Sequence, residues 1–349
     1  MTATLIIGPA WVGDMVMAQS LFQLLRRQEP GIAIDVVGPP WSVPLAGRMP
    51  EVRRGIPLAA GHGELALSAR RSLGRSLRAA GYDRAIVLPR SFKAALLPWF
   101  ARIPVRTGFA AELRGLLLND VRKLDRRILD QTIKRFLALG VPAGSPVPAA
   151  ITPVLRVDEA NRAALLARLG LGQRPAIAMM PGAAYGPAKQ WPINSFAALA
   201  RQLLERGFEI WVLGSGGERE LGEQIRSGAG ARVFNLCGQT SLEDTVDLLS
   251  ATRAAVTNDS GLMHVAAAAG TEVVAVYGSS SPHFTPPLTA RKVILYLGLD
   301  CSPCFRRECP LGHLNCLNQI SPASVLAAMR PEGTRSVGAP SGAINTDRA

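Results

Sequence analysis

The segment TNDSGLMHVAAAAG, which begins at Thr257, combines residue types that bind anions. A strand that ends at Thr257 and a helix that begins near Ser260 would leave free backbone N–H groups at Ser260 and Gly261, and such groups attract phosphate. Asp259 suits a ligand hydroxyl or the helix cap. His264 lies four residues after Ser260 on the same helical face, either as a ligand contact or as a buried structural histidine. The segment therefore predicts a phosphate site.

Asp14 ends the loop GPAWVGD, between an expected strand at Leu5–Gly8 and a helix that begins near Met15. Two roles fit this residue: the N-cap of that helix, or a carboxylate that faces a cleft as a general base. The loop lacks the GxGxxG pattern of a dinucleotide-binding turn. The chain also lacks GxxxxGK[ST], which excludes the P-loop kinases and ATPases.

The loop PGAAYGPAKQWP, which begins at Pro181, has the composition of a second ligand-binding turn. Its glycines permit close approach of a ligand to the backbone. Lys189 offers a positive charge suited to phosphate, and the alternative is a solvated surface lysine.

Two further loops have the order of strand, glycine turn and helix. In GSGGERE, which begins at Gly214, the glycines either approach a ligand or simply reverse the chain. In CGQTSLED, Ser241 and Asp244 have the spacing of a capping box. Gly238 and Gln239, just before that box, are candidates for contact with a nucleoside.

Four of the five cysteines lie in the block CSPCFRRECPLGHLNC, as Cys301, Cys304, Cys309 and Cys316, with His313 nearby. These ligand types bind zinc, although their spacing matches none of the usual finger patterns. Reduced structural thiols are the alternative, because stable disulfides are disfavoured in a reducing compartment.

The elements that must position these loops alternate between short apolar strands and helices, as in a parallel sheet built from βαβ units. We expect strands at Leu5–Gly8, Ile34–Val37, Ala85–Leu88, Ala176–Met180, Ile210–Gly214, Ala254–Thr257 and Val273–Tyr277. We expect helices at Met15–Arg27, Glu64–Ala80, Ser195–Arg206, Glu218–Ser227 and Leu242–Ser250. The fold class is therefore α/β, with two Rossmann-like doubly wound domains whose strand ends face one cleft.

A chain of 349 residues exceeds the usual size of a single core, so two domains are expected. We place the first at residues 1–150 and the second at residues 151–330, with the proline-rich segment Val141–Pro153 as the linker. Residues 331–349 lack a hydrophobic period and are expected to form a tail without regular structure.

Charge is concentrated in the first half. Residues 1–150 hold 21 Lys and Arg against 10 Asp and Glu, whereas the remainder holds 18 against 16. Such a field attracts nucleic acid, an anionic membrane or an acidic substrate. Nucleic acid is disfavoured, because no recognised binding module is present and aromatic residues make up only 5% of the chain.

No apolar run approaches the roughly 18 residues of a membrane span. The sequence opens on an apolar strand with no basic region before it, so no secretory signal is expected and the protein should stay in the cytoplasm.

Taken together, GPAWVGDMVMAQSL, MPEVRRGIPL, GYDRAIVLPRSFKAALLPWFARIPVRTGF, PGAAYGPAKQWP, VTNDSGLMHVAAAAG and YGSSSPHFTPPL resemble the ADP-heptose:lipopolysaccharide heptosyltransferases, glycosyltransferase family 9. The similarity is greatest to the heptosyltransferase II branch and covers about residues 4 to 330. It implies the GT-B fold and an inverting transfer of heptose from ADP-L-glycero-D-manno-heptose to the heptose of the lipopolysaccharide inner core. Neither a cofactor nor a metal is implied.

The resemblance also implies roles for individual residues. Asp14 would be the catalytic base, and Lys189 would stabilise the departing ADP diphosphate together with the backbone at Ser260 and Gly261. The donor would contact Gly13, Pro181, Gly182, Tyr185, Lys189, Gly214, Ser215, Gly238, Gln239, Asp259, Ser260, Gly261 and His264. Related heptosyltransferase I enzymes carry hydroxyl residues where this chain has Ala183, Ala184 and Tyr185, so contact there must use backbone or the tyrosine hydroxyl.

The implied acceptor is an anionic lipid A that bears Kdo and heptose, which suits a basic first half and a peripheral position on the cytoplasmic face of the inner membrane. Arg90, Lys93 and Arg106 are the candidates to bind it, and Trp99 and Phe100 either rest on the membrane or belong to the core.

Three other functions remain open from the sequence. Heptosyltransferase I, which adds the first heptose to Kdo, is the alternative within the family. A nucleotide-sugar epimerase has the same two-domain fold, and a two-lobed sugar-binding protein of the periplasmic type is the alternative that is not an enzyme.

Overall fold

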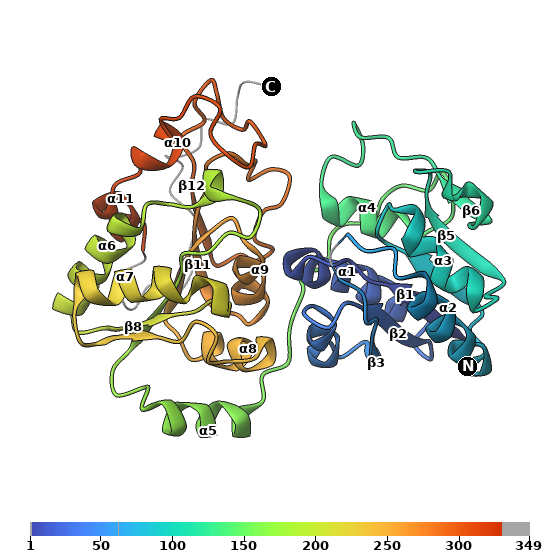
Figure 1. Ribbon diagram of the computed structural model, residues 1–349, viewed down its shortest axis with the longest axis horizontal. Coiled ribbons are helices and arrows are strands. Elements are labelled where there is room, and N and C mark those ends of the chain that lie inside the picture. Colours follow the sequence, from blue (N-terminus) through green and yellow to red (C-terminus); the bar gives the residue numbers. More distant parts are fainter. Residues whose placement is uncertain (1, 62, 330–349) are drawn as a thin grey trace.

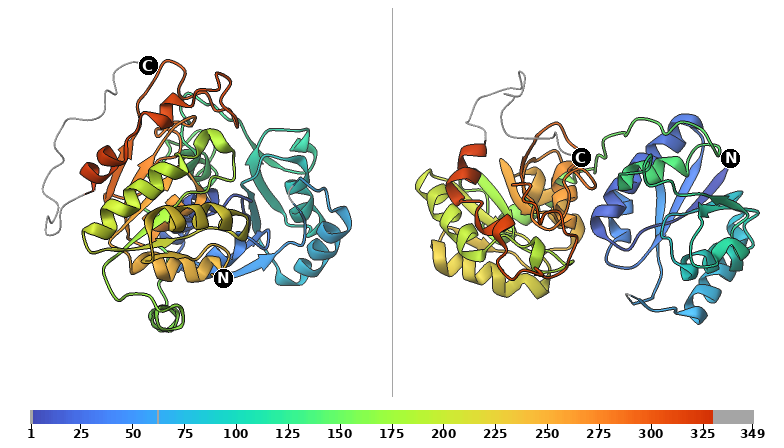
Figure 2. Two further views of the ribbon diagram at one scale, coloured as in Figure 1. Left: turned by 60° about the vertical axis from the view of Figure 1, so that its left-hand side comes forward. Right: turned by 90° about the horizontal axis from the view of Figure 1, so that it is seen from above.

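The computed structural model describes residues 2–61 and 63–329, which form two α/β domains. Each domain contains a parallel sheet of six strands, in the order β3-β2-β1-β4-β5-β6 in the first and β12-β11-β10-β7-β8-β9 in the second. Both orders are that of the Rossmann fold. Figure 1 shows the two sheets and their helices, and Figure 2 shows the domains as separate lobes. The predicted fold class is confirmed.

The first domain is built around β1, whose five residues are all buried. Its strands are β1 (Ala3–Ile7), β2 (Ala33–Gly38), β3 (Val52–Pro57), β4 (Arg84–Val87), β5 (Val105–Phe109) and β6 (Asp120–Arg122). Its helices are α1 (Val12–Gln28), α2 (Leu67–Ser76), α3 (Phe92–Phe100) and α4 (Thr132–Ala138), with 3-10 turns at Val43–Arg48, Leu77–Ala80 and Arg114–Leu116.

The second domain repeats this plan around β7, which is also buried throughout. Its strands are β7 (Ala176–Met180), β8 (Glu209–Val212), β9 (Val233–Asn235), β10 (Ala254–Asn258), β11 (Glu272–Val276) and β12 (Lys292–Leu295). Its helices are α5 (Glu159–Leu169), α6 (Ile193–Glu205), α7 (Arg219–Ala229), α8 (Leu242–Ser250), α9 (Gly261–Ala268), α10 (Asn315–Asn318) and α11 (Pro322–Ala328), with 3-10 turns at Pro187–Lys189 and Gly216–Glu218.

The expected elements agree with these bounds to within about two residues, except at the starts of two helices. The helix expected from Met15 begins three residues earlier, at Val12. The helix expected from Glu64 begins only at Leu67, because the Glu64 carboxylate accepts a hydrogen bond from the Gly61 N–H at 2.8 Å and Ala66 adopts a left-handed conformation. The capping box of α8 is confirmed, since the Ser241 hydroxyl accepts from the Asp244 N–H and the Asp244 carboxylate accepts from the Ser241 N–H, each at 3.0 Å.

The linker predicted at Val141–Pro153 lies in a segment without helix or strand that joins the two sheets. Side chains of α1 hold it: Gln19 bonds to both the carbonyl and the N–H of Val154, and Gln23 donates to the Thr152 carbonyl. The tail expected at residues 331–349 lies outside the described residues.

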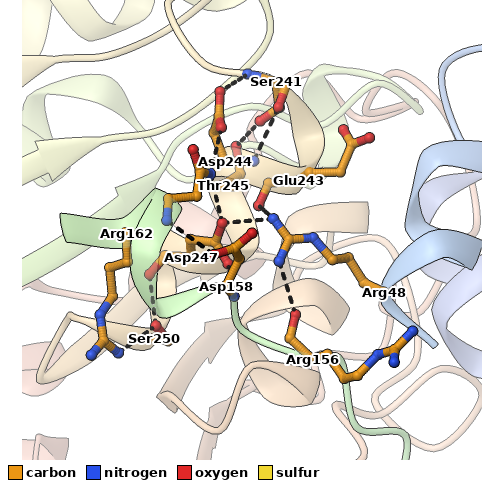
Figure 3. Close-up of polar contacts among 11 residues, drawn as sticks. Arg48, Arg156, Asp158, Arg162, Ser241, Glu243, Asp244, Thr245, Asp247 and Ser250 are labelled. Atoms are coloured by element: carbon orange, nitrogen blue, oxygen red, sulfur yellow. Dashed lines mark hydrogen bonds and ion pairs between the residues drawn. The ribbon is translucent and has the colours of Figure 1, made fainter. Parts of the chain in front are cut away.

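The domains meet through a polar cluster on one side, which Figure 3 shows. Arg48 of the first domain donates to the Asp247 carboxylate on α8 at 2.6 Å. The same buried carboxylate accepts from the Asp158 N–H at 2.8 Å and from the Asn161 amide at 2.7 Å, at the start of α5. One carboxylate therefore joins both domains and the helix that follows the linker.

Replacement of Asp247 should destabilise the fold. Asp247→Ala removes a buried acceptor shared by Arg48, the Asp158 N–H and the Asn161 amide, and loss of one partner of a buried pair costs about 3 kcal/mol. Denaturant unfolding measures the difference. Glu223→Ala is the control, because Glu223 pairs with Arg226 on the exposed surface of α7 and its loss should have little effect. Equal effects of the two variants would contradict this account of the cluster.

Candidate active site

The carboxyl ends of the strands place the predicted site residues at two equivalent positions. Ligands bind α/β sheets where the strand order reverses, which here is between β1 and β4 and between β7 and β10. Asp14 follows β1, and Arg90 follows β4. Lys189 follows β7, and Asp259 follows β10. The topology therefore brings all four loops to the space between the domains.

Asp14 is the third residue of α1 and not its cap. The N-cap is Trp11, so the interpretation of Asp14 as the capping residue is wrong. The side chain is partly buried. Burial raises the pKa of Asp14 from its ordinary value of 3.8 to about 6, the positive charge of Lys189 opposes this shift, and the negative charge of Asp259 adds to it. A carboxylate with a pKa near 6 suits a general base at neutral pH.

Lys189 and Asp259 form an ion pair beside Asp14, with 2.5 Å between the Lys189 Nζ and an Asp259 carboxylate oxygen. Asp259 is buried and Lys189 largely so. The interpretation of Lys189 as a solvated surface lysine is therefore wrong. Asp259 does not cap α9, because the N-cap is Ser260.

Asn258, which the sequence analysis did not single out, holds the Lys189 loop against β10. Its amide donates to the Pro181 carbonyl at 2.6 Å, and its oxygen accepts from the Trp191 N–H at 2.9 Å. The Asn258 side chain therefore bonds to both ends of this loop. The signal was its place beside Asp259 in the NDS triplet.

The starts of α1 and α9 touch each other across the domain boundary. A Cβ on Gly13 would lie 2.6 Å from the His264 ring, and a Cβ on Gly261 would lie 2.9 Å from the Cβ of Val12. Only glycine permits so close an approach. His264 is buried, and this burial lowers its pKa to about 4, so the imidazole is neutral at pH 7.

The start of α9 keeps the free N–H groups that the sequence predicted. Ser260 is an extended N-cap whose side chain accepts no capping bond, and its hydroxyl lies 3.4 Å from that of Thr257. Ser260 and Gly261 both remain partly exposed. A helix start of this kind suits an anion.

Glu218 is a further candidate that sequence reasoning missed. Its carboxylate accepts from the Ser215 N–H at 2.6 Å and from the Ser215 hydroxyl at 2.9 Å. A Cβ on Gly182 would lie 1.3 Å from one of its oxygens, and a Cβ on Gly214 would lie 2.8 Å from the other. Both glycines therefore make room for this carboxylate. The GSGGE sequence after β8 was its signal.

The loop after β9 packs on the loop after β8. Gly238 has a φ of +72°, and a Cβ there would lie 2.7 Å from the Gly216 Cα. The Gln239 amide donates to the Asn235 carbonyl at 2.6 Å. These two predicted residues therefore shape the edge of the site.

Tyr185 joins the site to the cysteine block. Its hydroxyl donates to the Phe305 carbonyl at 2.7 Å, and its ring lies 5.0 Å from the Lys189 Nζ and 5.4 Å from the Arg307 guanidinium. The hydroxyl that was expected to reach a donor is thus already bonded within the chain.

The four clustered cysteines are free thiols and line one small cavity, together with His313. Backbone N–H groups of the turn after Cys309 lower the pKa of its thiol. Within residues 2–61 and 63–329, no group of three or more His, Cys, Asp or Glu side chains is arranged to hold a metal ion. The four thiols and His313 therefore share one cavity, and zinc binding and reduced structural thiols both stay predictions for them.

The three basic residues predicted for an acceptor lie in different places. Arg90 is exposed at the carboxyl end of β4, and Lys93 is partly exposed on α3. Arg106 lies at the amino end of β5, where its guanidinium donates at 2.6 Å to the carbonyls of both Leu117 and Ile103. Arg106 is therefore bound within its own sheet edge and is not brought to the site.

Arg135 of α4 was not predicted and lies closer to the site. Its guanidinium stacks 4.7 Å from the ring of Phe284 in the second domain, and its positive charge lowers the pKa of Asp14. The charge and the aromatic contact across the domains could not be read from the spacing of residues along the chain.

Substitution of Asp14 should stabilise the protein in a manner that depends on pH. Since the folded pKa is about 6 against 3.8 unfolded, ionisation of Asp14 costs folding free energy above pH 6 and nothing below pH 3.8. Asp14→Asn should therefore raise the free energy of unfolding by about 2 kcal/mol more at pH 7.5 than at pH 4. Denaturant titrations at the two pH values measure this, and a gain independent of pH would contradict the buried carboxylate.

Comparison with known proteins shows the family of this chain. The model of glycosyltransferase family 9 (heptosyltransferase) matches residues 70–315. The chain is 44% identical to lipopolysaccharide heptosyltransferase 2 of Escherichia coli, over 92% of this chain and 96% of that protein. It is 43% identical to lipooligosaccharide heptosyltransferase 2 of Haemophilus influenzae, over 84% and 88%. The solved structure of E. coli ADP-heptose LPS heptosyltransferase II matches with a TM-score of 0.85 at 42% identity, over 94% of this chain and 97% of that one.

Proposed function

The chain belongs to glycosyltransferase family 9, the heptosyltransferases, and from that membership we propose that it is a heptosyltransferase II. It transfers heptose from ADP-L-glycero-D-manno-heptose to the heptose of the lipopolysaccharide inner core. The observation that carries this proposal is Asp14, a partly buried carboxylate with a pKa of about 6 beside the Lys189–Asp259 pair. The names and high coverage of the relatives support the substrate assignment.

The reaction proposed is a single displacement. A hydroxyl of the acceptor heptose attacks the anomeric carbon of the donor, and its proton passes to the Asp14 carboxylate. The bond between the anomeric carbon and the diphosphate oxygen breaks, and its electron pair leaves with ADP. Attack from the face opposite the leaving group inverts the anomeric configuration.

The second domain is proposed to hold the donor. Negative charge grows on the diphosphate as the bond breaks, and Lys189 together with the N–H groups at Ser260 and Gly261 suits its stabilisation. Asp259 orients Lys189 through their ion pair. Glu218, at the glycine loop after β8, is placed like the carboxylates that bind ribose hydroxyls in Rossmann folds.

The first domain is proposed to hold an anionic, lipid-linked acceptor at the cytoplasmic face of the inner membrane. Arg90, Lys93 and Arg135 supply positive charge on the same side as Asp14. Among the described residues, no helix is long and apolar enough to cross a bilayer. We propose that the positively charged side chains bring the first domain to the membrane surface, where the acceptor lies.

Mass spectrometry of products from two acceptors tests the assignment. With ADP-heptose, the protein should add one heptose to a lipid A acceptor that carries Kdo and one heptose, and none to the acceptor that carries Kdo alone. Asp14→Ala should lower kcat by about 10²- to 10⁴-fold. Lys189→Ala should lower it by about 10²- to 10³-fold, because the diphosphate loses its cation.

Asp125→Ala is the matched control, since this carboxylate belongs to the same domain and pairs with exposed Arg127. It should retain wild-type turnover. Transfer to the Kdo-only acceptor would identify a heptosyltransferase I instead. Full activity of Asp14→Ala would contradict the proposed base.

A further inference from the structure

The loop between β5 and β6 presents two leucines to solvent. Leu113 is 86% exposed and Leu116 is 84% exposed, more than the other exposed large apolar side chains of the described residues. Single exposed apolar residues are ordinary on protein surfaces, but two almost fully exposed leucines on one short turn are not. The turn that carries them is a 3-10 helix at Arg114–Leu116.

The loop is held firmly in this shape. Arg114, between the two leucines, is completely buried and donates to the carbonyls of Phe109 and Pro89, at the carboxyl ends of β5 and β4. Glu112 accepts from the Phe92 N–H at 2.7 Å, at the start of α3. Glu112 and Leu113 both have positive φ, of 43° and 56°. Such backbone persists only where the surroundings enforce it, so the exposed leucines are built into the fold.

The helix to which this loop is bonded carries two further exposed apolar side chains. Phe92, bonded through its backbone to the loop, is exposed at the start of α3, and Trp99 is exposed near the end of that helix. Trp99 packs edge-on against Phe100. Aromatic rings and leucines of this kind suit the boundary between headgroups and acyl chains.

Positively charged side chains act both on Arg114 of this loop and on the proposed base. Burial and the charge of Arg90 lower the pKa of Arg114 to about 10, and the charges of Arg126 and Arg90 contribute to a lowered pKa of the partly buried Arg135. Arg135 in turn acts on Asp14. Arg90 and Arg126 are both exposed, and they lie on a domain with an excess of basic residues.

We propose that Leu113 and Leu116, together with the exposed Arg90 and Arg126, form the surface by which the first domain docks on an anionic bilayer. The leucines enter the headgroup boundary, and the arginines pair with lipid phosphates. In this orientation the basic side chains of the first domain would face an acceptor whose lipid end lies in the same bilayer. The inference rests on the proposed function, because that function supplies a lipid-linked substrate.

Vesicle sedimentation tests this docking surface. The full chain should bind vesicles of phosphatidylethanolamine and phosphatidylglycerol at low salt and bind vesicles of phosphatidylcholine weakly. Leu113→Ser/Leu116→Ser should lower the bound fraction at least about fivefold, because binding scales with buried apolar area. Leu297→Ser/Leu311→Ser is the matched control, since these exposed leucines lie in the second domain, and its binding should equal that of the wild type.

Two measurements exclude an indirect effect of the loop substitutions. The melting temperature of the double variant should match the wild type. In a separate variant, Leu113→Trp, tryptophan emission should shift to shorter wavelength on anionic vesicles relative to the wild type. Unchanged vesicle binding by the double variant, or no emission shift, would overturn the proposal. A change of oligomeric state in the double variant, measured by light scattering, would instead assign the leucines to contact between copies and also overturn it.

Kinetics separate this inference from the proposed function. With acceptor embedded in anionic vesicles, Leu113→Ser/Leu116→Ser should raise KM at least fivefold, while kcat and KM for a deacylated, water-soluble acceptor stay at wild-type values. Equal losses on both acceptors would contradict docking by the loop. Failure of the wild type to transfer heptose to either acceptor would refute the proposed function, and the sedimentation result would still stand.

Discussion

The close contact between the starts of α1 and α9 is the constraint on which the site depends. Gly13 lies against the ring of His264, and Gly261 lies against Val12, at distances that leave no space for a Cβ. This contact sets the distance between the two sheets at their carboxyl ends. Asp14 is the residue after Gly13, so this contact places it near Lys189 and Asp259 of the other domain. Neither domain contains the complete constellation alone.

The electrostatics of the site follow from that contact. Burial disfavours the charged form of Asp14, Asp259 adds repulsion, and Lys189 offsets part of both. The same burial keeps His264 neutral, so it adds no positive charge that would stabilise the Asp14 carboxylate. The balance leaves a carboxylate that is ionised at neutral pH and still basic enough to accept a proton. A donor diphosphate bound by Lys189 would alter this balance, since it would share the cation that now lowers the pKa of Asp14.

The fold and the loops of the site were predictable from local patterns, because strand ends, glycine turns and helix starts recur at short spacing. The strand at Ala176–Met180 and the helix at Leu242–Ser250 agree with the structure residue by residue. Two roles were assigned wrongly, one because of a helix boundary and one because of contacts with backbone carbonyls. Asp14 was weighed as a cap, although its helix starts two residues earlier at Val12. Arg106 was assigned to the acceptor, although backbone carbonyls at the amino end of its strand hold it.

Glu218 and Arg135 were missed because each has contacts with residues distant in the sequence. The Glu218 carboxylate fits into space left by Gly182 and Gly214, which lie 36 and 4 residues before it. A short sequence motif could not reveal a contact between residues so far apart. Arg135 stacks on the ring of Phe284, which belongs to the other domain. The loops and several of their side chains were therefore found from the sequence, whereas the contacts of Glu218 and Arg135 with distant residues required the structure.

The pKa of the Asp14 side chain, measured by ¹³C NMR on aspartate-labelled protein and assigned by comparison with Asp14→Asn, tests the central claim most directly. The account predicts a value of about 6 in the wild type, a higher value in Lys189→Ala and a lower one in Asp259→Asn. A value near 4 that neither substitution moves would contradict it, because Asp14 would then lie in water, apart from the second domain.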